Sequence, residues 1–579
     1  MPSEKSFLSN PKYGYDFVVA TTQASINSGL KEYLANSDQP TTYLCFLVDD
    51  EGLPSKYIDL DDLKKLTGGV NPFEIPEDTP YDDPRISKLT EARFIVGLKL
   101  KMGLPPGILP KDLPPIVELG SSASNVTFNL FCSEFQIVEN TPPGGFVKKG
   151  KWQVFNQPQV INQNNKLWSF QTNVNLIYKD LEKDLNTPYF KQFPKQRKAL
   201  LARIQNLESG AFSLQQLLFD LDNAGLSSVP SIHGIENGSN ANLVLTKYFL
   251  TYYFKQVKAH GDPVISVHAV TNSADPSTLK LTGLEREVSP FVDGNGIVIK
   301  YPTKEQSAVK TLDFLCAVNN NHLPGAATFD WNWVDPDQLN EESGVIAINR
   351  NTIANYFKHQ LLPVVKQSCV KPWTKTVAKN IVGSLWYYAS FTPGQTPTSI
   401  VIPTSGPDVL KFSYRNEARS HDKMAATYGE LNIVDTYDCT VSFSGKKITI
   451  VQHSVVNVYA QWAATGDSSN VVDIKITDDY ELSIGQSGDI QVKLVNTNKE
   501  DKSSTGRVDC WRNFWTGVDD LLARIAKKVQ VTESPRINDI PATDLQNFIF
   551  PGGKVFTYKD VIFSDNQDLV AKITYLKPS

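Results

Sequence analysis

The residue types that could support chemistry in this sequence are few and far apart. His260 and Asp262, with His268 eight residues after the first histidine, have the side chains of a metal site with two histidines and one carboxylate. The alternative is a histidine at a helix end, a turn aspartate and a strand histidine, and we favour this structural interpretation. His421 and Asp422 stand side by side in EARSHDKMAATYGE, which we interpret as a polar loop without a catalytic role.

The motifs that define common catalytic and cofactor sites are absent from the sequence. There is no GxSxG nucleophile elbow, no GxxxxGK[ST] phosphate loop, no GxGxxG fingerprint and no HExxH zinc motif. The glycine-rich stretch VDGNGIV at 292–298 predicts a hairpin turn. The acidic stretch PEDTPYDDPR at 76–85 lacks the spacing of a calcium loop and reads as solvated. We therefore predict no catalytic residue, no metal ion and no cofactor.

Length and composition limit the class of protein. A chain of 579 residues is expected to form roughly two to four domains. The apolar share of 41% and the charged share of 21% are those of a folded globular protein. The net charge of −5 provides no global basic field, so a nucleic acid is not expected as the main partner. The six cysteines form no CxxC pair and are interpreted as buried thiols.

The sequence also bears on location and on membrane contact. The N-terminal residues lack the apolar core of a secretory signal, which predicts a cytoplasmic chain, with release by a non-classical route left open. The apolar run at 243–254 is too short and too polar to span a bilayer. FVKKGKW at 146–152 is a basic–aromatic patch that could contact anionic headgroups, although a plain hairpin tip is the favoured interpretation.

A strand–helix unit occurs twice along the chain. VVATTQASINSGLKEYL at 18–34 and VIAINRNTIANYFKHQL at 345–361 align without a gap and share five identical positions. LLARI recurs at 200–204 and 521–525, and LQQLLF at 214–219 matches LQNFIF at 545–550. The three pairs keep the same order, with offsets of 327, 321 and 331 residues. We infer a duplicated unit, with a first module at 13–320, a linker at 321–343 and a second module at 344–579.

Each copy is expected to contain a helix with one apolar stripe, and Thr21 or Thr22 can cap the first of them. Pro363 should kink or end the second helix. Long runs of alternating character follow and predict antiparallel strands with one buried face, including a hairpin at SGKK. The two stripes are formed by Ile26, Leu30 and Leu34 and by Ile353, Phe357 and Leu361.

A long sheet with a single apolar face must bury that face, and wrapping the sheet around a long helix achieves this. The predicted fold class is therefore α+β, with two tandem modules that each wrap a strongly curved antiparallel sheet around a helix. Such a wrap can leave an elongated apolar cavity, for which the two stripes supply candidate wall residues. Tyr248 and Tyr252 share one face of a further predicted helix and are candidates for a cavity mouth or a membrane-touching edge, with ordinary core as the alternative.

Three stretches resemble a known group of proteins. YGYDFVVATTQASINSGLKEYL, GVIAINRNTIANYFKHQLLP and NFIFPGGKVFTYKDVIFSDNQDLVAKITYL are similar to the tubular lipid-binding (TULIP) superfamily, in particular to accessory proteins of clostridial neurotoxin gene clusters. The Gly-Tyr-Asp stretch at 14–16 and the PGG turn at 551–553 carry the resemblance. It implies non-enzymatic binding or transfer of lipids or other apolar small molecules, with peripheral membrane contact and a protein partner as further expectations. The alternatives are a structural subunit of a toxin-like complex and an enzyme of unrecognised type that acts on an apolar small molecule.

Overall fold

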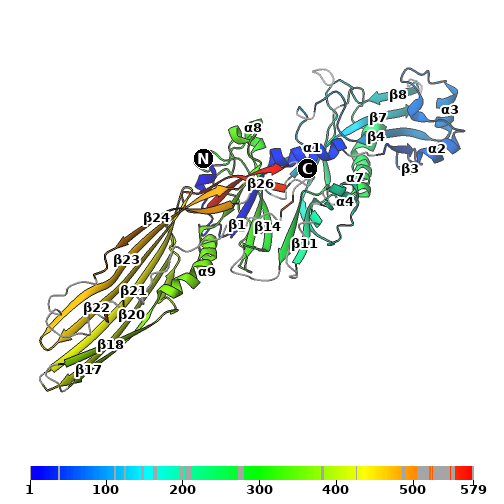
Figure 1. Cartoon of the computed structure of the whole chain (residues 1–579). Helices are drawn as coiled ribbons and strands as arrows, with labels where there is room; N and C mark the ends of the chain where they lie inside the picture. Colours follow the sequence, from blue (N-terminus) through cyan, green and yellow to red (C-terminus); the bar gives the residue numbers. More distant parts are fainter. Residues whose placement is uncertain are drawn as a thin grey trace.

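The computed structural model shows an elongated molecule in which both chain ends lie near the middle (Figure 1). The structure describes residues 2–36, 40–109, 112–120, 122, 126–144, 149–160, 166–195, 197–198, 200–201, 212–222, 224–230, 232–261, 263–271, 279–379, 384–425, 427–485, 490–504, 521–522, 525, 548–549 and 555–576. Within this part every strand pairing in the sheets is antiparallel, and each sheet is open at both edges. The α+β class and the antiparallel character predicted from the sequence are confirmed.

A six-stranded central sheet occupies the middle of the molecule and joins the two ends of the chain. Its order is β14-β15-β1-β16-β27-β26. The strands are β14 (Leu281–Ser289), β15 (Thr311–Val318), β1 (Phe17–Thr22), β16 (Gly344–Ile348), β27 (Leu569–Leu576) and β26 (Val555–Phe563).

The two copies of the repeated strand, β1 and β16, are direct neighbours in this sheet. Val19 lies opposite Ile346, Val18 opposite Ala347 and Ala20 opposite Val345. A two-fold axis between β1 and β16 would impose this register. Such an axis places each residue of β1 on the residue of β16 with which it aligns in the sequence, for example Val18 on Val345. The backbone agrees, since Thr22 N donates to Ser343 O at 3.1 Å and, equivalently, Asn349 N donates to Asp16 O at 2.9 Å.

Each repeated strand leads into a helix with a side-chain cap. Thr22 Oγ1 accepts from Ser25 N at 3.2 Å at the start of α1 (Gln23–Asn36), as the sequence predicted. Asn349 Oδ1 accepts from Asn351 N at 2.9 Å at the start of α9 (Arg350–Ser368). Pro363 does not end α9, which continues to Ser368.

The long sheet lies at one end of the molecule, beside α9 (Figure 1). Its order is β19-β20-β21-β22-β23-β24, and a separate hairpin, β17–β18, packs on β20 and β21. The strands are β17 (Lys371–Lys379), β18 (Ser384–Thr392), β19 (Ser399–Val401), β20 (Asp408–Met424), β21 (Thr427–Ser444), β22 (Lys447–Trp462), β23 (Thr465–Ile484) and β24 (Ile490–Asp501).

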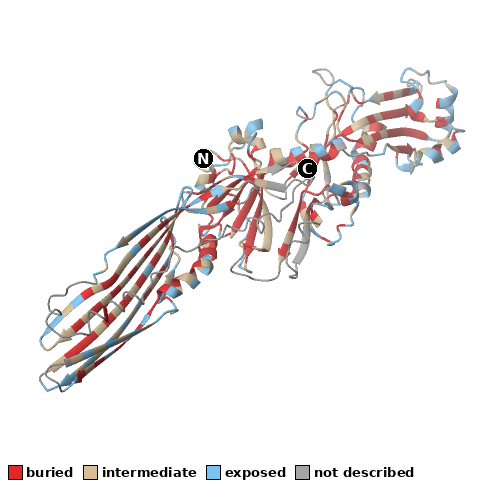
Figure 2. Cartoon of the chain, viewed as in Figure 1, coloured by how far each residue is buried: buried red, intermediate tan, exposed pale blue. Residues whose placement is uncertain are grey.

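The long sheet confirms one sequence prediction and corrects another. The SGKK hairpin joins β21 to β22, and buried and less buried residues alternate along these strands (Figure 2). The stretch around His421 and Asp422 is not a loop, because both residues belong to β20 and pair with β21. Polar composition misled here because the distal part of β20 carries polar side chains on both faces. Arg419 and His421 are exposed, while Ser420 and Asp422 form hydrogen bonds with the β17–β18 hairpin.

Three smaller sheets lie on the other side of the central sheet and differ from the single meander expected for the first half. Their orders are β3-β2-β4-β7-β8, β10-β11-β13-β25 and β12-β9-β6-β5. The strands are β2 (Thr42–Leu47), β3 (Lys56–Ile58), β4 (Phe94–Met102), β5 (Val117–Leu119), β6 (Val126–Leu130), β7 (Cys132–Thr141), β8 (Lys151–Asn156), β9 (Phe170–Val174), β10 (Leu176–Leu181), β11 (Phe212–Phe219), β12 (Gly225–Ser228), β13 (Ser266–Thr271) and β25 (Phe548–Ile549).

Short helices lie beside these sheets and beside the central sheet. They are α2 (Leu60–Leu66), α3 (Pro84–Glu91), α4 (Pro188–Gln192), α6 (Asn240–Lys247), α7 (Phe249–His260) and α8 (Lys304–Ala308), with 3-10 turns η1 (Pro2–Lys5), η2 (Pro72–Glu74) and η3 (Pro336–Gln338). Both copies of LLARI are helical where they are described, at 200–201 and at 521, 522 and 525. In the described part, no helix combines the length and the apolar character of a segment that could cross a bilayer. The PGG turn at 551–553 and residues 146–148 of the FVKKGKW patch lie outside the described residues, whereas Lys151 and Trp152 of the patch begin β8.

The segment 321–343, which composition suggested to be a linker, is packed against the central sheet. Phe329, Trp331 and Trp333 are buried, and their rings make tilted or edge-to-face contacts with one another. Phe329 and Trp331 also contact the ring of Tyr13. This cluster covers the face of the sheet that carries Val18 and Val345, while the main core covers the face that carries Val19 and Ile346. The central strands are therefore buried on both sides, which explains their continuous apolar sequence.

Candidate functional site

The six stripe residues predicted as cavity wall are all buried in the main core. Their exposed fractions do not exceed 9%, and α1 and α9 extend from the central sheet toward opposite ends of the molecule (Figure 1). The α1 stripe is formed by Ile26, Leu30 and Leu34, and the α9 stripe by Ile353, Phe357 and Leu361. The structure therefore places the two sets apart, one stripe for each half of the chain.

Tyr248 and Tyr252 are half-buried beside the five-stranded sheet. The ring of Tyr248 lies 5.1 Å from that of Phe46, and the ring of Tyr252 lies 5.0 Å from that of Tyr57. On the other face of α7, Tyr253 is buried and its hydroxyl donates to Phe131 O at 3.1 Å. Tyr248 and Tyr252 therefore lie at the boundary between the core and solvent.

The described residues do not test whether the candidate histidine and carboxylate group, His260, Asp262 and His268, comes together. Asp262 and the side chain of His260 lie outside them. His268 is fully buried in β13, where its Nε2 lies 2.7 Å from Ser266 Oγ. Burial lowers the pKa of His268 to about 3, so the imidazole is neutral.

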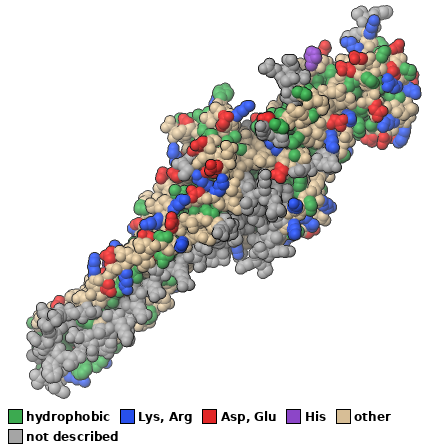
Figure 3. Space-filling view, turned by 45° about the horizontal axis from the view of Figure 1, so that its top comes forward, with side chains coloured by type: hydrophobic (Ala, Val, Ile, Leu, Met, Phe, Trp, Pro, Cys, Tyr) green, Lys and Arg blue, Asp and Glu red, His purple; other side chains and the backbone are tan. Residues whose placement is uncertain are grey.

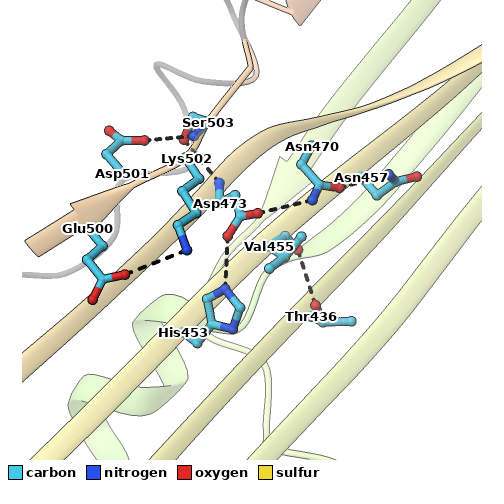
Figure 4. A network of polar contacts seen from close by, with 10 residues as sticks. All are labelled: Thr436, His453, Val455, Asn457, Asn470, Asp473, Glu500, Asp501, Lys502 and Ser503. Atoms are coloured by element: carbon cyan, nitrogen blue, oxygen red, sulfur yellow. Dashed lines mark hydrogen bonds and ion pairs between the residues drawn. The ribbon is translucent and has the colours of Figure 1, made fainter.

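Figure 4 shows a polar network on the outer face of the long sheet. His453 Nε2 lies 2.9 Å from Asp473 Oδ1, and Asn470 Nδ2 donates to Asp473 Oδ2 at 3.1 Å. The hydrogen bond from His453 lowers the pKa of Asp473. These groups satisfy one another across β22 and β23, which is typical of a structural network on a wet sheet face.

The start of α9 is firmly anchored to the rest of the chain. The buried Arg350 side chain donates to Gln567 Oε1, Pro403 O and Asp408 O at distances of 2.9 to 3.1 Å. Nearby lies a cleft of about 450 Å³, whose lining includes five asparagines from the start of α9 and from the turn after β15, together with residues of the N-terminal segment. The carboxylate of Asp16 at this cleft accepts from Thr352 Oγ1, Val318 N and Asn321 Nδ2 and is fully engaged.

The inner face of the long sheet, which α9 and the β17–β18 hairpin cover, carries a polar belt in its middle. We use this name for Asp435 and Tyr437 on β21 and Gln452 and Ser454 on β22, all of which are buried. Tyr437 lies opposite Ser454 in the register, and its hydroxyl donates to Gln452 Oε1 at 2.7 Å.

Apolar side chains flank the polar belt in both directions. Toward the central sheet lie Val441, Phe443, Ile448 and Ile450, which share the main core with the α9 stripe. Toward the distal end lie Leu431, Ile433, Val456 and Val458, which pack with the helical residues Leu521, Leu522 and Ile525. The belt lies beside the junction between α9 and β17. Val370 belongs to this junction, and its backbone N donates to Asp435 Oδ2 at 3.1 Å.

Two atoms of the belt have no hydrogen-bond partner among the described residues, Asp435 Oδ1 and Gln452 Nε2. Their residues are 0% and 1% exposed. Burial raises the pKa of Asp435 to about 7, so its carboxyl group can be protonated near neutral pH and then donate a hydrogen bond. The belt thus offers an amide donor and a carboxyl group inside an apolar enclosure.

The same enclosure argues against thiol chemistry. Cys369 and Cys439 lie beside the belt, and burial raises the pKa of each thiol to about 12. Neither is therefore a thiolate near neutral pH, and the thiolate is the nucleophilic form. The arrangement suits binding rather than covalent catalysis.

Sequence reasoning missed the polar belt, although a signal was present. On β21 and β22 the inward positions are apolar at both ends and switch to Asp, Tyr, Gln and Ser in the middle. Polar side chains at inward positions of an alternating strand are the exception that points to a site. These polar residues could have been recognised once the apolar residues at both ends of each strand had shown which alternate positions face inward.

Comparisons with known proteins find similar solved structures but show no family. The sequence matches no family model and no curated protein. P47 of Clostridium botulinum E1 is 11% identical, with 97% of this chain and 98% of that chain covered and a TM-score of 0.43. A lipopolysaccharide-binding protein is also 11% identical, with 98% and 100% covered and a TM-score of 0.27. Because both TM-scores lie below 0.5, the function proposed below rests on the site itself.

Proposed function

We propose that this chain is a non-enzymatic binding protein for lipid-like amphiphiles, which it holds on the inner face of the long sheet. The polar belt receives the head of the ligand, and the apolar part lies against the α9 stripe. The observation that carries the proposal is the pair of buried atoms without partners, Asp435 Oδ1 and Gln452 Nε2. Buried polar groups in folded proteins nearly always have hydrogen-bond partners. We therefore expect a ligand or water to supply the partners of these two atoms inside the apolar face.

The energetics favour an amphiphile over a purely apolar molecule. Each unpaired buried group costs about 1–3 kcal/mol, which a head with one acceptor and one hydroxyl would recover. Gln452 Nε2 would donate to an ester, carboxyl or phosphoryl oxygen, and Asp435 would accept from or donate to a hydroxyl. The apolar part adds about 25 cal/mol for each Å² that it buries.

We further propose that the chain consists of two equivalent modules, 13–320 and 344–579, with 321–343 as their connection. The two-fold register of β1 and β16 and the matching helix starts support this division. In each half, the strand pairs with the last strand of its own half, β15 or β27. Ile353, Phe357 and Leu361 would form the apolar wall in the second module. Ile26, Leu30 and Leu34 would do so in the first, with Tyr248 and Tyr252 at its rim.

We predict that Gln452→Leu weakens the retention of a co-purified amphiphile by about tenfold or more. Leucine keeps the size of the side chain but removes the amide donor, so the head loses a contact that the apolar face cannot replace. Native mass spectrometry of freshly purified wild type should show a bound mass that Gln452→Leu loses by about tenfold or more, equivalent to about 1.4 kcal/mol.

The matched control is Gln491→Leu, the same change at an exposed position of edge strand β24 in the same sheet. It should retain the bound mass, and thermal melts should show all three proteins folded. A clean unliganded mass for the wild type, together with no lipid transfer between vesicles, would contradict the proposal.

A structural subunit remains the second candidate, and one observation favours it. Strand β24 is an edge strand of the long sheet, and Leu494 and Val495 are 42% and 48% exposed on it. An exposed edge with apolar side chains can pair with a strand of another chain. A wild type without ligand that assembles with a partner through β24 would favour this second function.

A further inference from the structure

The β17–β18 hairpin presents an exposed face of aromatic and basic side chains. Trp373, Trp386 and Tyr388 are 53%, 44% and 45% exposed. Lys375 lies opposite Tyr388 in the hairpin register, and Lys379 Nζ lies 5.1 Å from the ring centroid of Trp386. We call the surface formed by Lys371, Trp373, Lys375, Lys379, Trp386 and Tyr388 the distal face.

The hairpin is fixed so that this face must point outward. Its alternate residues are buried against β20 and β21, where Thr376 Oγ1 lies 2.9 Å from Ser420 Oγ. On β18 the Tyr387 hydroxyl donates to Gln461 O at 2.7 Å. Gly429 leaves room for Leu385, because a Cβ there would lie 2.5 Å from Leu385 Cδ1. The aromatic side chains are thus held on a rigid support.

The charge around the distal face differs from that of the rest of the chain. From Ser343 to Pro407 the sequence contains no aspartate or glutamate, although the whole chain carries a net charge of −5. The hairpin contributes three lysines to this stretch. Asp422 of β20 also contacts the hairpin, where its carboxylate accepts from Ala378 N at 2.8 Å, and the three lysines outnumber this one negative charge.

We propose that the distal face docks the protein on the surface of an anionic lipid bilayer. Tryptophan and tyrosine prefer the interface between headgroups and hydrocarbon, and lysines beside them are attracted to anionic lipids. The hairpin lies at the far end of the elongated molecule (Figure 1), and in Figure 3 a few green and blue side chains are visible at the tip of that end. A membrane can approach this end without obstruction from the central sheet. This docking is independent of the ligand proposed for the polar belt.

Co-sedimentation with phosphatidylcholine vesicles, with and without phosphatidylserine, tests the proposal. The wild type should bind the vesicles that contain phosphatidylserine, and high salt should weaken this binding. Replacement of the three lysines with glutamine should weaken it by about a hundredfold at low salt. The aromatic variant W373S/W386S/Y388S should lose about tenfold or more.

Tyr301→Ser is the matched control. Tyr301 is 83% exposed and lies 5.6 Å from Lys300 Nζ, so it reproduces an aromatic–lysine pair on another part of the surface. This variant should bind like the wild type. Wild type that fails to bind either vesicle, or distal-face variants that bind as well as Tyr301→Ser, would overturn the proposal. So would aromatic variants that lose self-association or a protein partner while vesicle binding is unchanged.

Discussion

Replacement of Asp568 with alanine is expected to lower the free energy of unfolding by about 3–5 kcal/mol. Asp568 is fully buried in the turn before β27. Its carboxylate accepts from Leu8 N at 2.7 Å, Ser6 Oγ at 2.8 Å and Arg350 N at 3.0 Å. These donors come from the N-terminal segment and from the first turn of α9, so one side chain connects three distant parts of the chain. Alanine would leave three buried donors without an acceptor.

Chemical denaturation of the variant beside the wild type measures this cost. Asp568→Asn should also be strongly destabilised, because one of its amide positions would present hydrogens to the donors. The control is Asp565→Ala, which changes an exposed aspartate of the same turn and should leave the stability almost unchanged. Equal unfolding free energies for Asp568→Ala and Asp565→Ala would show that the buried network contributes nothing.

The parts of the fold that the sequence predicts are those set by local pattern. The strand–helix units at Val18 and Val345 form as expected, because a short apolar strand, a capping residue and a helical stripe are all encoded within about 17 residues of sequence. The hairpin at Gly445 follows for the same reason.

Long-range pairings could not be predicted from local pattern. Strand β1 pairs with β15, almost 300 residues away. Both strands are buried on both faces, so their sequences lack the alternation that would fix a register. The packing of 321–343 was missed because its tryptophans stand among asparagine, proline and acidic residues, which are typical of loops. Burial of its aromatic side chains arises only once the central sheet exists.

The candidate site was predicted in part. An apolar helical stripe such as Ile353, Phe357 and Leu361 predicts burial, and the structure shows burial. The same pattern cannot distinguish a sealed core from the wall of a ligand site, because both require apolar side chains at helical spacing. In our proposal, Asp435 and Gln452 are the residues that distinguish a ligand site from a sealed core. Their inward direction could be predicted only if the sequence showed which residues of β21 and β22 face the core.

Asp435→Asn is expected to stabilise the protein at pH 8 and to lose this advantage in acid. Burial raises the pKa of Asp435 to about 7 in the folded chain, whereas an unfolded carboxyl group titrates near its ordinary value of 3.8. Between these values the folded protein retains a proton that the unfolded chain has released, so stability falls as pH rises from about 4 to 7 and stays low above it. Asparagine removes this cost, and its oxygen can still accept from Val370 N. The gain at pH 8 should be on the order of 2–4 kcal/mol.

The groups around Asp435 make the experiment specific. Burial raises the pKa of Tyr414 and of the Cys369 thiol to about 12 and that of Tyr437 further, so none of them titrates between pH 4 and 8.

Asp473 on the outer face provides the opposite control, because its hydrogen bond with His453 lowers its pKa. The stability that Asp473 contributes is present above the unfolded pKa and is lost as pH falls. Asp473→Asn should therefore cost stability at neutral pH and not in acid. Urea denaturation of both variants and the wild type across pH 4 to 8 would show differences of opposite sign. Parallel curves for Asp435→Asn and the wild type would mean that the Asp435 carboxyl group titrates normally, and that the polar belt is open to water rather than enclosed.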